Sequence, residues 1–265
     1  MIRAVTGVSL VSLLIATSIG VFLLSGVGKV YLDSKSTYGV RDAVSIASEN
    51  ARFAIDDLRR SLLMAGRGIS PGKDTRDNYV NDPTGNERTF PNIAPNGIVD
   101  IDNVDPNLGS SIIAFRHGSG PTPCGGTGVV SALTTVRFLV NANSELVCEI
   151  NGGLQVLVAG IIRMRALYGV DTDFDGIANQ YLTAAQLEIG RTEPLQPFWN
   201  NVVAIRIGLI VSSGERELPL KHRLNAAETL NLLGADFTML DTSHFFKAVS
   251  TTISLRNLNT IVQRQ

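Results

Sequence analysis

Six consecutive residues, Asp171 to Gly176, could bind a metal ion. Their order, D-x-D-x-D-G, opens a calcium-binding loop, in which alternating carboxylates supply oxygen ligands and the glycine allows a sharp turn. Asp171, Asp173 and Asp175 are therefore candidate ligands. Asn179 joins them because it falls at the ninth position of such a loop, where another oxygen ligand is expected.

The end of this segment departs from the calcium-loop pattern. Its twelfth position is Leu182, whereas a calcium loop needs a bidentate glutamate there. The alternative interpretation is an Asp- and Gly-rich turn that joins two strands. Calcium is thus one of two hypotheses for the segment, and the sequence predicts no other cofactor.

Other residue types that carry chemistry do not form a recognisable site. His117, His222 and His244 are far apart in sequence and lack metal-ligand spacing. Ser119 lies in HGSGP, which is not the G-x-S-x-G pattern of a hydrolase nucleophile. The glycines within 125–128 do not open a helix with a downstream lysine, as a phosphate loop does. We therefore predict that the protein is not an enzyme and has no catalytic residues.

Length and charge narrow the function classes further. The 265 residues can form one sizeable domain, or two small ones, beside an N-terminal segment. The formal net charge of −1 gives no overall field that would attract nucleic acid, so no nucleic-acid partner is predicted.

The chain is organised around an apolar N-terminal segment. Residues 4–28 contain no charged side chain, with Arg3 before them and Lys29 after them. Such a run can cross a bilayer core of about 30 Å as a helix. It is longer than the apolar core of a secretory signal, although residues 16–18 resemble a poor cleavage site. An ordinary membrane anchor fits its length equally well.

A helical pattern continues beyond this segment, with apolar residues at steps of three and four and charges on the other faces. The apolar stripe comprises Val40, Val44, Ala47, Ala51, Ile55, Leu58 and Leu62. Gly66 and Gly68 then supply a stop. We predict one helix from Val8 to about Ala65, roughly 85 Å long at 1.5 Å per residue. A cleaved signal peptide is not expected to continue into such a helix.

The rest of the chain is rich in turn residues and then in β-branched residues. Residues 69–110 predict a long loop region with one short strand near 97–101. Strands are predicted at 111–117, 134–140, 145–150, 161–170, 202–213 and 245–257. Short helices are predicted at 183–190, capped by Thr183, and near 225–233. The predicted fold class is α+β: one long helix, apolar in its first half and amphipathic in its second, packed on an antiparallel β-sheet.

The two cysteines predict a disulfide if the body is exported. Cys124 and Cys148 form an even set, and one bridge between them would stabilise the fold by about 3 kcal/mol. The alternative, two separate buried thiols, suits a cytosolic body. Because the apolar segment favours export, we predict the disulfide.

Several stretches together carry a family resemblance. A short basic leader ending in Gly, followed by VSLVSLLIATSIGVFLL, marks the type IV pilin superfamily, while YGVDTDFDG, NVVAIRI and the C-terminal VSTTISLRN are more specific. With these stretches the chain resembles the PilW family of type IV pilus minor pilins along almost its whole length. The resemblance implies a pilin-like fold with four parts. These are a leader peptide at 1–7, a transmembrane and filament-core half-helix at 8–30, an amphipathic half-helix at 31–65 and a periplasmic β-rich body at 66–265.

The resemblance also implies processing, location and partners. A prepilin peptidase would cut between Gly7 and Val8, and the new N-terminus, Val8, would be methylated. The protein would span the bacterial inner membrane once, with its body in the periplasm. It would then join other minor and major pilins at the assembly platform and help to initiate or cap a pilus. The alternatives are a minor pseudopilin of a type II secretion system and a membrane-anchored periplasmic enzyme.

Ser12 departs from the family pattern. Pilins usually carry Glu at this fifth mature residue, where the acid pairs with the N-terminal amine of a neighbouring subunit. A buried carboxylate is costly unless it is paired, and Ser12 supplies no charge for this docking step. Family exceptions that lack the acid are associated with the tip, where no subunit lies above. Ser12 therefore favours a tip or near-tip position.

Overall fold

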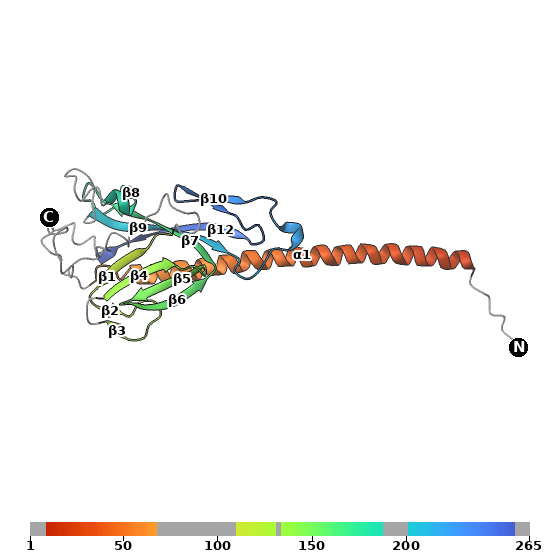
Figure 1. Ribbon diagram of the computed structural model, residues 1–265, viewed down its shortest axis with the longest axis horizontal. Helices are drawn as coiled ribbons and strands as arrows, with labels where there is room; N and C mark the ends of the chain where they lie inside the picture. The colour runs from red at the N-terminus through yellow and green to blue at the C-terminus, as the bar shows by residue number, and fades with distance from the viewer. Residues whose placement is uncertain (1–8, 68–109, 131–133, 188–200, 258–265) are drawn as a thin grey trace.

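The computed structural model describes residues 9–67, 110–130, 134–187 and 201–257. Its longest element is helix α1 (Leu10–Leu62), which contains 53 residues. Figure 1 shows that the N-terminal half of α1 projects alone from the molecule, while its C-terminal half lies within a β-rich body. The predicted long helix is thereby confirmed.

Only the second half of α1 has a buried face. The buried residues recur at steps of three and four: Ala43, Ala47, Ala51, Ala54, Leu58, Ser61 and Leu62. The predicted stripe is confirmed at its C-terminal end, where Leu58 and Leu62 are fully buried. Val40, Val44 and Ile55 are half-buried at its edge.

The chain leaves α1 through a glycine turn. Gly66 has a φ of 75°, in the left-handed region that glycine adopts readily. Its N–H donates to the carbonyl of Arg116 at 2.9 Å, which ties the end of the helix to the β-sheet. Helix α1 ends at Leu62, and Gly66 lies in the turn that follows it, whereas Gly68 lies outside the described residues.

Within its described residues, the body contains two four-stranded antiparallel sheets where the sequence predicted one. The first sheet has the order β1–β4–β5–β6 and the second β12–β9–β7–β8. The first consists of β1 (Ile113–His117), β4 (Thr134–Val140), β5 (Glu145–Ile150) and β6 (Gly153–Ala159). The second consists of β7 (Ile161–Val170), β8 (Gln180–Leu182), β9 (Val202–Ser212) and β12 (Phe246–Ser254). Two short pairs are added to them, β2 (Gly120–Pro121) with β3 (Val129–Val130) and β10 (Glu228–Leu232) with β11 (Ala235–Met239).

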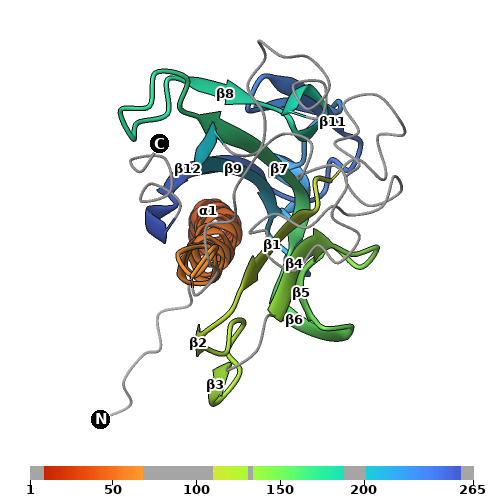
Figure 2. The same cartoon turned by 90° about the vertical axis from the view of Figure 1, so that its left-hand side faces the viewer.

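The main hydrophobic core lies between α1 and both sheets. Figure 2, which looks along α1, shows the second sheet curving over the helix and the first sheet beside it. Leu58 and Leu62 of α1 belong to the same buried cluster as Phe115 and Phe138 of the first sheet and Ile205 of the second. This architecture confirms the predicted α+β class, with a long helix packed on antiparallel strands.

The strand predictions are confirmed for β1, β4, β5, β7, β9 and β12, whereas the other strands are additional. The predicted helix near 225–233 is wrong, because β10 occupies these residues and pairs with β11. The predicted cap is present: Thr183 Oγ1 accepts the N–H of Gln186 at 3.2 Å, and residues 184–187 are helical. The predicted loop region at 69–110, up to residue 109, lies outside the described residues.

Candidate functional site

The N-terminal half of α1 forms a continuous apolar surface that the body does not cover. Its large apolar side chains are more than half exposed: Leu10, Val11, Leu13, Leu14, Ile15, Ile19, Val21, Phe22, Leu23, Leu24, Val27 and Val30. Among the described residues, α1 is the one helix long and apolar enough to cross a membrane. A helix that is apolar all round needs an apolar environment, so this surface fits a bilayer core or a bundle of similar helices.

Ser12 lies near the start of this surface. Its hydroxyl donates to the carbonyl of Ser9 at 2.7 Å, the local bond that serine commonly makes in a helix. The hydroxyl is thus used within α1, and the side chain carries no charge. Gly7 and Val8, the predicted cleavage position, lie outside the described residues.

The segment from Asp171 to Gly176 is a tightly hydrogen-bonded turn between β7 and β8. Asp171 is fully buried, and its carboxylate accepts the backbone N–H groups of Phe174 at 2.6 Å and Gly176 at 2.7 Å. A third N–H, that of Asp175, donates at 3.3 Å. Asp173 and Asp175 are exposed, and the ligand oxygens of the three aspartates lie within 4.8 Å of one another. The structure therefore brings the three predicted carboxylates together.

Asn179 and Leu182 contribute to the same turn in other ways. Asn179 Oδ1 accepts the backbone N–H of Thr172 at 3.2 Å and its hydroxyl at 3.1 Å. Leu182 is buried in β8, so the twelfth position offers no side-chain oxygen. These contacts explain the segment as a turn. Calcium binding by the three aspartates and Asn179 stays a prediction, which thermal unfolding in calcium and in EDTA would test.

Two opposing effects act on the pKa of Asp171. Burial raises the pKa because the charged form loses solvation. Hydrogen bonds from the N–H groups of Gly176 and Phe174 lower it and outweigh burial, so the pKa lies below the ordinary value of 3.8. The ionised carboxylate is therefore the form that stabilises the fold.

Asp171→Asn should lower the free energy of unfolding by about 2 kcal/mol at neutral pH, because an amide cannot accept all three N–H groups. Since the folded pKa lies below the unfolded one, the carboxylate's contribution is complete above about pH 4 and is lost as the pH falls through the folded pKa. The difference in the free energy of unfolding between Asp171→Asn and the original protein should therefore become smaller at acidic pH. Chemical denaturation at neutral and acidic pH measures this difference in the free energy of unfolding. Equal stability of Asp171→Asn and the original at neutral pH would contradict this assignment.

Cys124 and Cys148 form a disulfide, with their Cα atoms 6.2 Å apart. Cys124 lies between β2 and β3, and Cys148 lies in β5. Both residues are buried and belong to the main core cluster. The bridge therefore ties the β2–β3 segment to the first sheet.

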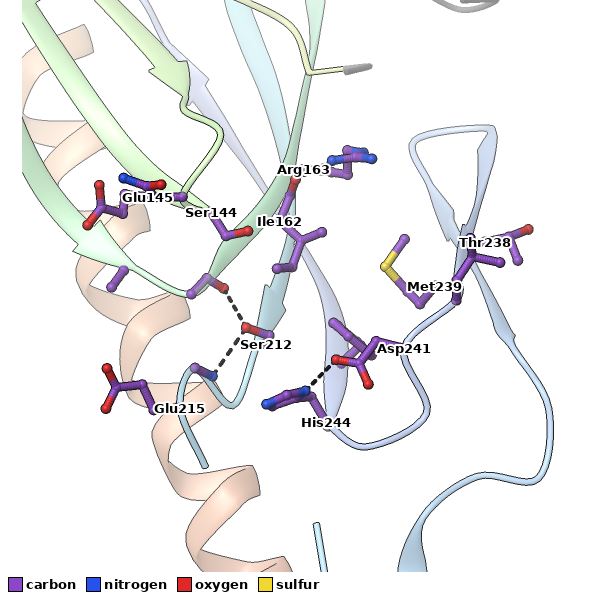
Figure 3. Close-up of a pocket in the computed structure, with 16 residues that line it drawn as sticks. Ser144, Glu145, Ile162, Arg163, Ser212, Glu215, Thr238, Met239, Asp241 and His244 are labelled. Atoms are coloured by element: carbon purple, nitrogen blue, oxygen red, sulfur yellow. Dashed lines mark hydrogen bonds and ion pairs between the residues drawn. The ribbon is translucent and has the colours of Figure 1, made fainter. Parts of the chain in front are cut away.

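A cavity of about 710 Å³ lies where the ends of the two sheets meet hairpin β10–β11. Its lining combines apolar and titratable side chains, including Ile162, Met239, Phe246, Glu145, Glu215 and Asp241. Figure 3 shows the hydrogen bonds of Ser212, whose hydroxyl donates to the carbonyl of Gly160 at 3.3 Å and accepts the N–H of Gly214 at 3.2 Å. This hydroxyl therefore holds neighbouring backbone together.

His244 at the edge of this cavity belongs to a local turn. Its Nδ1 contacts both Asp241 and Ser243. A catalytic triad instead uses the two ring nitrogens separately, one toward the nucleophile and one toward the acid. Burial raises the pKa of Asp241, but hydrogen bonds from Ser243 and His244 outweigh it and hold that pKa below its usual range. The contacts thus stabilise the turn that precedes β12.

The three histidines do not meet in space. His117 is buried in β1, where burial lowers the pKa of its imidazole. His222 lies in the 3₁₀ helix η2 (Leu220–His222), and His244 lies beside Asp241. Among the described residues, the aspartates of the β7–β8 turn are the one cluster with metal-ligand geometry.

Part of the chain matches a known protein family. Residues 132–257 match the model of the PilW family, described as type IV pilus-assembly protein W. Over these residues, just under half of the chain, the predicted resemblance to the PilW family is confirmed. The match includes the strands from β4 to β12 and the β7–β8 turn. The PilW match supports a structural role connected with type IV pili.

A type IV-like pilin from Thermus thermophilus is similar over 80% of this chain and 97% of that chain, with 12% sequence identity and a TM-score of 0.44. No curated protein matches the sequence.

Proposed function

We propose that this protein is a minor pilin that helps to initiate or cap a type IV pilus, as a structural subunit without catalysis. The observation that carries the proposal is the division of α1. One continuous helix exposes an apolar first half and buries its second half under the β-sheets. Such a helix can remain in a bilayer and later pack among the helices of a filament, while the body stays outside. The PilW match supports the same function.

Each part of the chain has its own role in this function. Residues 1–7 are a leader that a prepilin peptidase removes between Gly7 and Val8, after which Val8 is methylated. Residues 8–30 hold the subunit in the bacterial inner membrane and then lie in the filament core. Residues 31–65 join this segment to a periplasmic body, 66–265, which contacts other minor and major pilins.

Ser12 supports a place at or near the pilus tip. It carries no charge and its hydroxyl bonds within α1, so it cannot provide the carboxylate that pilins use to dock beneath a preceding subunit. A subunit at the tip has no subunit above it and does not need that carboxylate. Gold-labelled antibodies against the body should therefore mark pilus ends and leave the shaft unlabelled; labelling along the shaft would contradict the tip position.

Deletion of the gene tests the function itself. We expect a deletion strain to lose most surface pili and to recover them when the intact gene is supplied. A deletion strain with normal pili and impaired protein secretion would instead favour the pseudopilin alternative. Electron microscopy of surface pili and assay of secreted protein distinguish the two outcomes.

A further inference from the structure

The loop between β9 and β10 lies against α1 where its exposed half meets the body. Lys221 of η2 pairs with Asp33 of α1, with Nζ and Oδ1 2.6 Å apart, and Arg216 pairs with Asp42, also at 2.6 Å. A Cβ added to Gly39 of α1 would lie only 2.9 Å from a ring carbon of Pro219. In Figure 1 this light-blue loop is the part of the body nearest the projecting half of the helix. The loop is thus fixed at one height along α1.

That height corresponds to the surface of a bilayer. The uncharged run ends at Gly28, and the part of α1 from Leu10 to Gly28 spans about 28 Å, close to the thickness of a hydrocarbon core. Lys29 is then at the boundary, and Asp33 lies about 6 Å further along the axis. The polar layer of a bilayer is about 5–8 Å thick on each side. Lys221, bonded to Asp33, therefore lies within the headgroup layer when α1 spans the membrane.

The residues at this height have the chemistry of a membrane-surface contact. Leu220 is 81% exposed and Tyr31 is 66% exposed, although both are apolar in large part. Leucine side chains of this kind insert between lipids, and tyrosine is enriched at membrane interfaces. Leu224, beyond η2, is also exposed.

Positive charge prevails around these apolar residues. Residues 29–35 and 217–224 contain four cationic side chains, Lys29, Lys35, Lys221 and Arg223, and two carboxylates, Asp33 and Glu217. The hydrogen bond and charge of Lys221 lower the pKa of Asp33, and Lys29 and His222 lower it further, so three basic groups surround one acid. Two positive charges remain unneutralised, and anionic headgroups attract such groups within a Debye length.

We propose that the η2 loop rests on the membrane surface, with Leu220 among the lipids and the surrounding lysines on anionic phospholipid headgroups. The inference rests on the proposed membrane-spanning role of α1. The contact holds the body against the bilayer in the subunit that awaits assembly. Extraction into a pilus has to break this contact.

Bromolipid quenching of tryptophan fluorescence tests the contact in the full chain, reconstituted in vesicles of phosphatidylglycerol and phosphatidylcholine. Leu220→Trp should be quenched, whereas Val129→Trp, exposed in β3 on another part of the body, should show only the background of the natural Trp199. Phe22→Trp reports separately whether α1 is inserted. Suppose that Phe22→Trp is quenched but Leu220→Trp is quenched no more than Val129→Trp. That result would overturn the inference and leave the proposed function intact. No quenching at position 22 would refute the spanning role of α1 and this inference with it.

Charge variants test the lipid class. Lys35→Gln combined with Lys221→Gln should reduce quenching of Leu220→Trp in phosphatidylglycerol vesicles to the level seen in pure phosphatidylcholine. Asp33→Asn is the matched control, because it breaks the same ion pair with Lys221 but increases the positive charge. Quenching should persist or increase in that control. Equal quenching of Leu220→Trp, with all natural charges kept, in phosphatidylglycerol vesicles and in pure phosphatidylcholine would overturn the assignment to anionic headgroups.

Discussion

Replacing Leu58 with alanine is expected to lower the free energy of unfolding of the body by about 3–4 kcal/mol. Leu58 is fully buried on the face of α1 that meets the sheets, in the same cluster as Phe115 and Ile205. Leu58→Ala removes its packing against this cluster and leaves a cavity that both sheets must close around. The effect is large because one side chain joins three layers of the fold.

Chemical denaturation of the full chain in detergent, followed by circular dichroism, measures this effect. Leu154→Ala is the matched control, because Leu154 lies on β6 and is 70% exposed. The control should change the free energy of unfolding by less than about 0.5 kcal/mol. If Leu58→Ala and Leu154→Ala lowered the free energy of unfolding by the same small amount, α1 would not be an integral part of the body's core.

Removing the disulfide is expected to cost about 3 kcal/mol, by the chain-entropy estimate for a loop of this length. Cys124→Ser combined with Cys148→Ser removes the bridge while keeping side chains of similar size. Strands β2 and β3 form a separate two-stranded sheet, and the bridge ties the segment between them covalently to β5.

Thermal unfolding with and without a reducing agent measures the loss. The original protein should be destabilised by reduction to the level of the double variant, and the double variant should not respond to reductant. Peptide mapping under non-reducing conditions provides the direct check. Recovery of both cysteines as free thiols from exported protein would contradict the bridge.

Hydrophobic periodicity was sufficient to predict α1 and six strands. The stripe ending at Leu58 and Leu62 repeats at helical spacing, and alternation in β4 follows the two-residue period of a strand. These elements are far apart in the sequence but pack against one another, so burial determines their hydrophobic patterns. Local pattern and tertiary structure therefore agree.

Hairpin β5–β6 could also have been predicted from its turn. Asn151 and Gly152 have φ angles of 48° and 88°, as a two-residue type I′ turn requires, and Asn-Gly is the strongest short signal for such a turn. The uncharged strand that follows, β6, lies at the edge of its sheet. Because most side chains of β6 are exposed, this strand lacks the alternation of buried and exposed residues that marks other strands.

Hairpin β10–β11 lacks a comparable signal. Its turn places Leu233 at a φ of 52° beside Gly234, and leucine rarely adopts this conformation. The preceding residues, rich in Ala, Glu and Leu, favour a helix by intrinsic propensity. Packing overrides that propensity: Leu232 is buried against β9, where an added Cβ at Gly208 would lie 2.7 Å from Leu232 Cδ1.

The candidate sites were predictable only in part. Spacing brought Asp171, Asp173 and Asp175 together on one turn, but it could not show that the carboxylate of Asp171 is occupied by backbone N–H groups. The contact between η2 and α1 brings together residues such as Asp33 and Lys221, which are 188 positions apart in the sequence. Such a contact forms only in the folded protein and has no local sequence pattern.

The most direct test of the proposed function is mass spectrometry of the mature N-terminus. Protein purified from cells with an active prepilin peptidase should begin at N-methylated Val8, and Gly7→Val should block this cleavage. Protein from cells without the peptidase should keep the leader. A mature chain that retains Met1 in cells with the peptidase, or one that begins near Ser18, would contradict the assignment of this protein as a pilin.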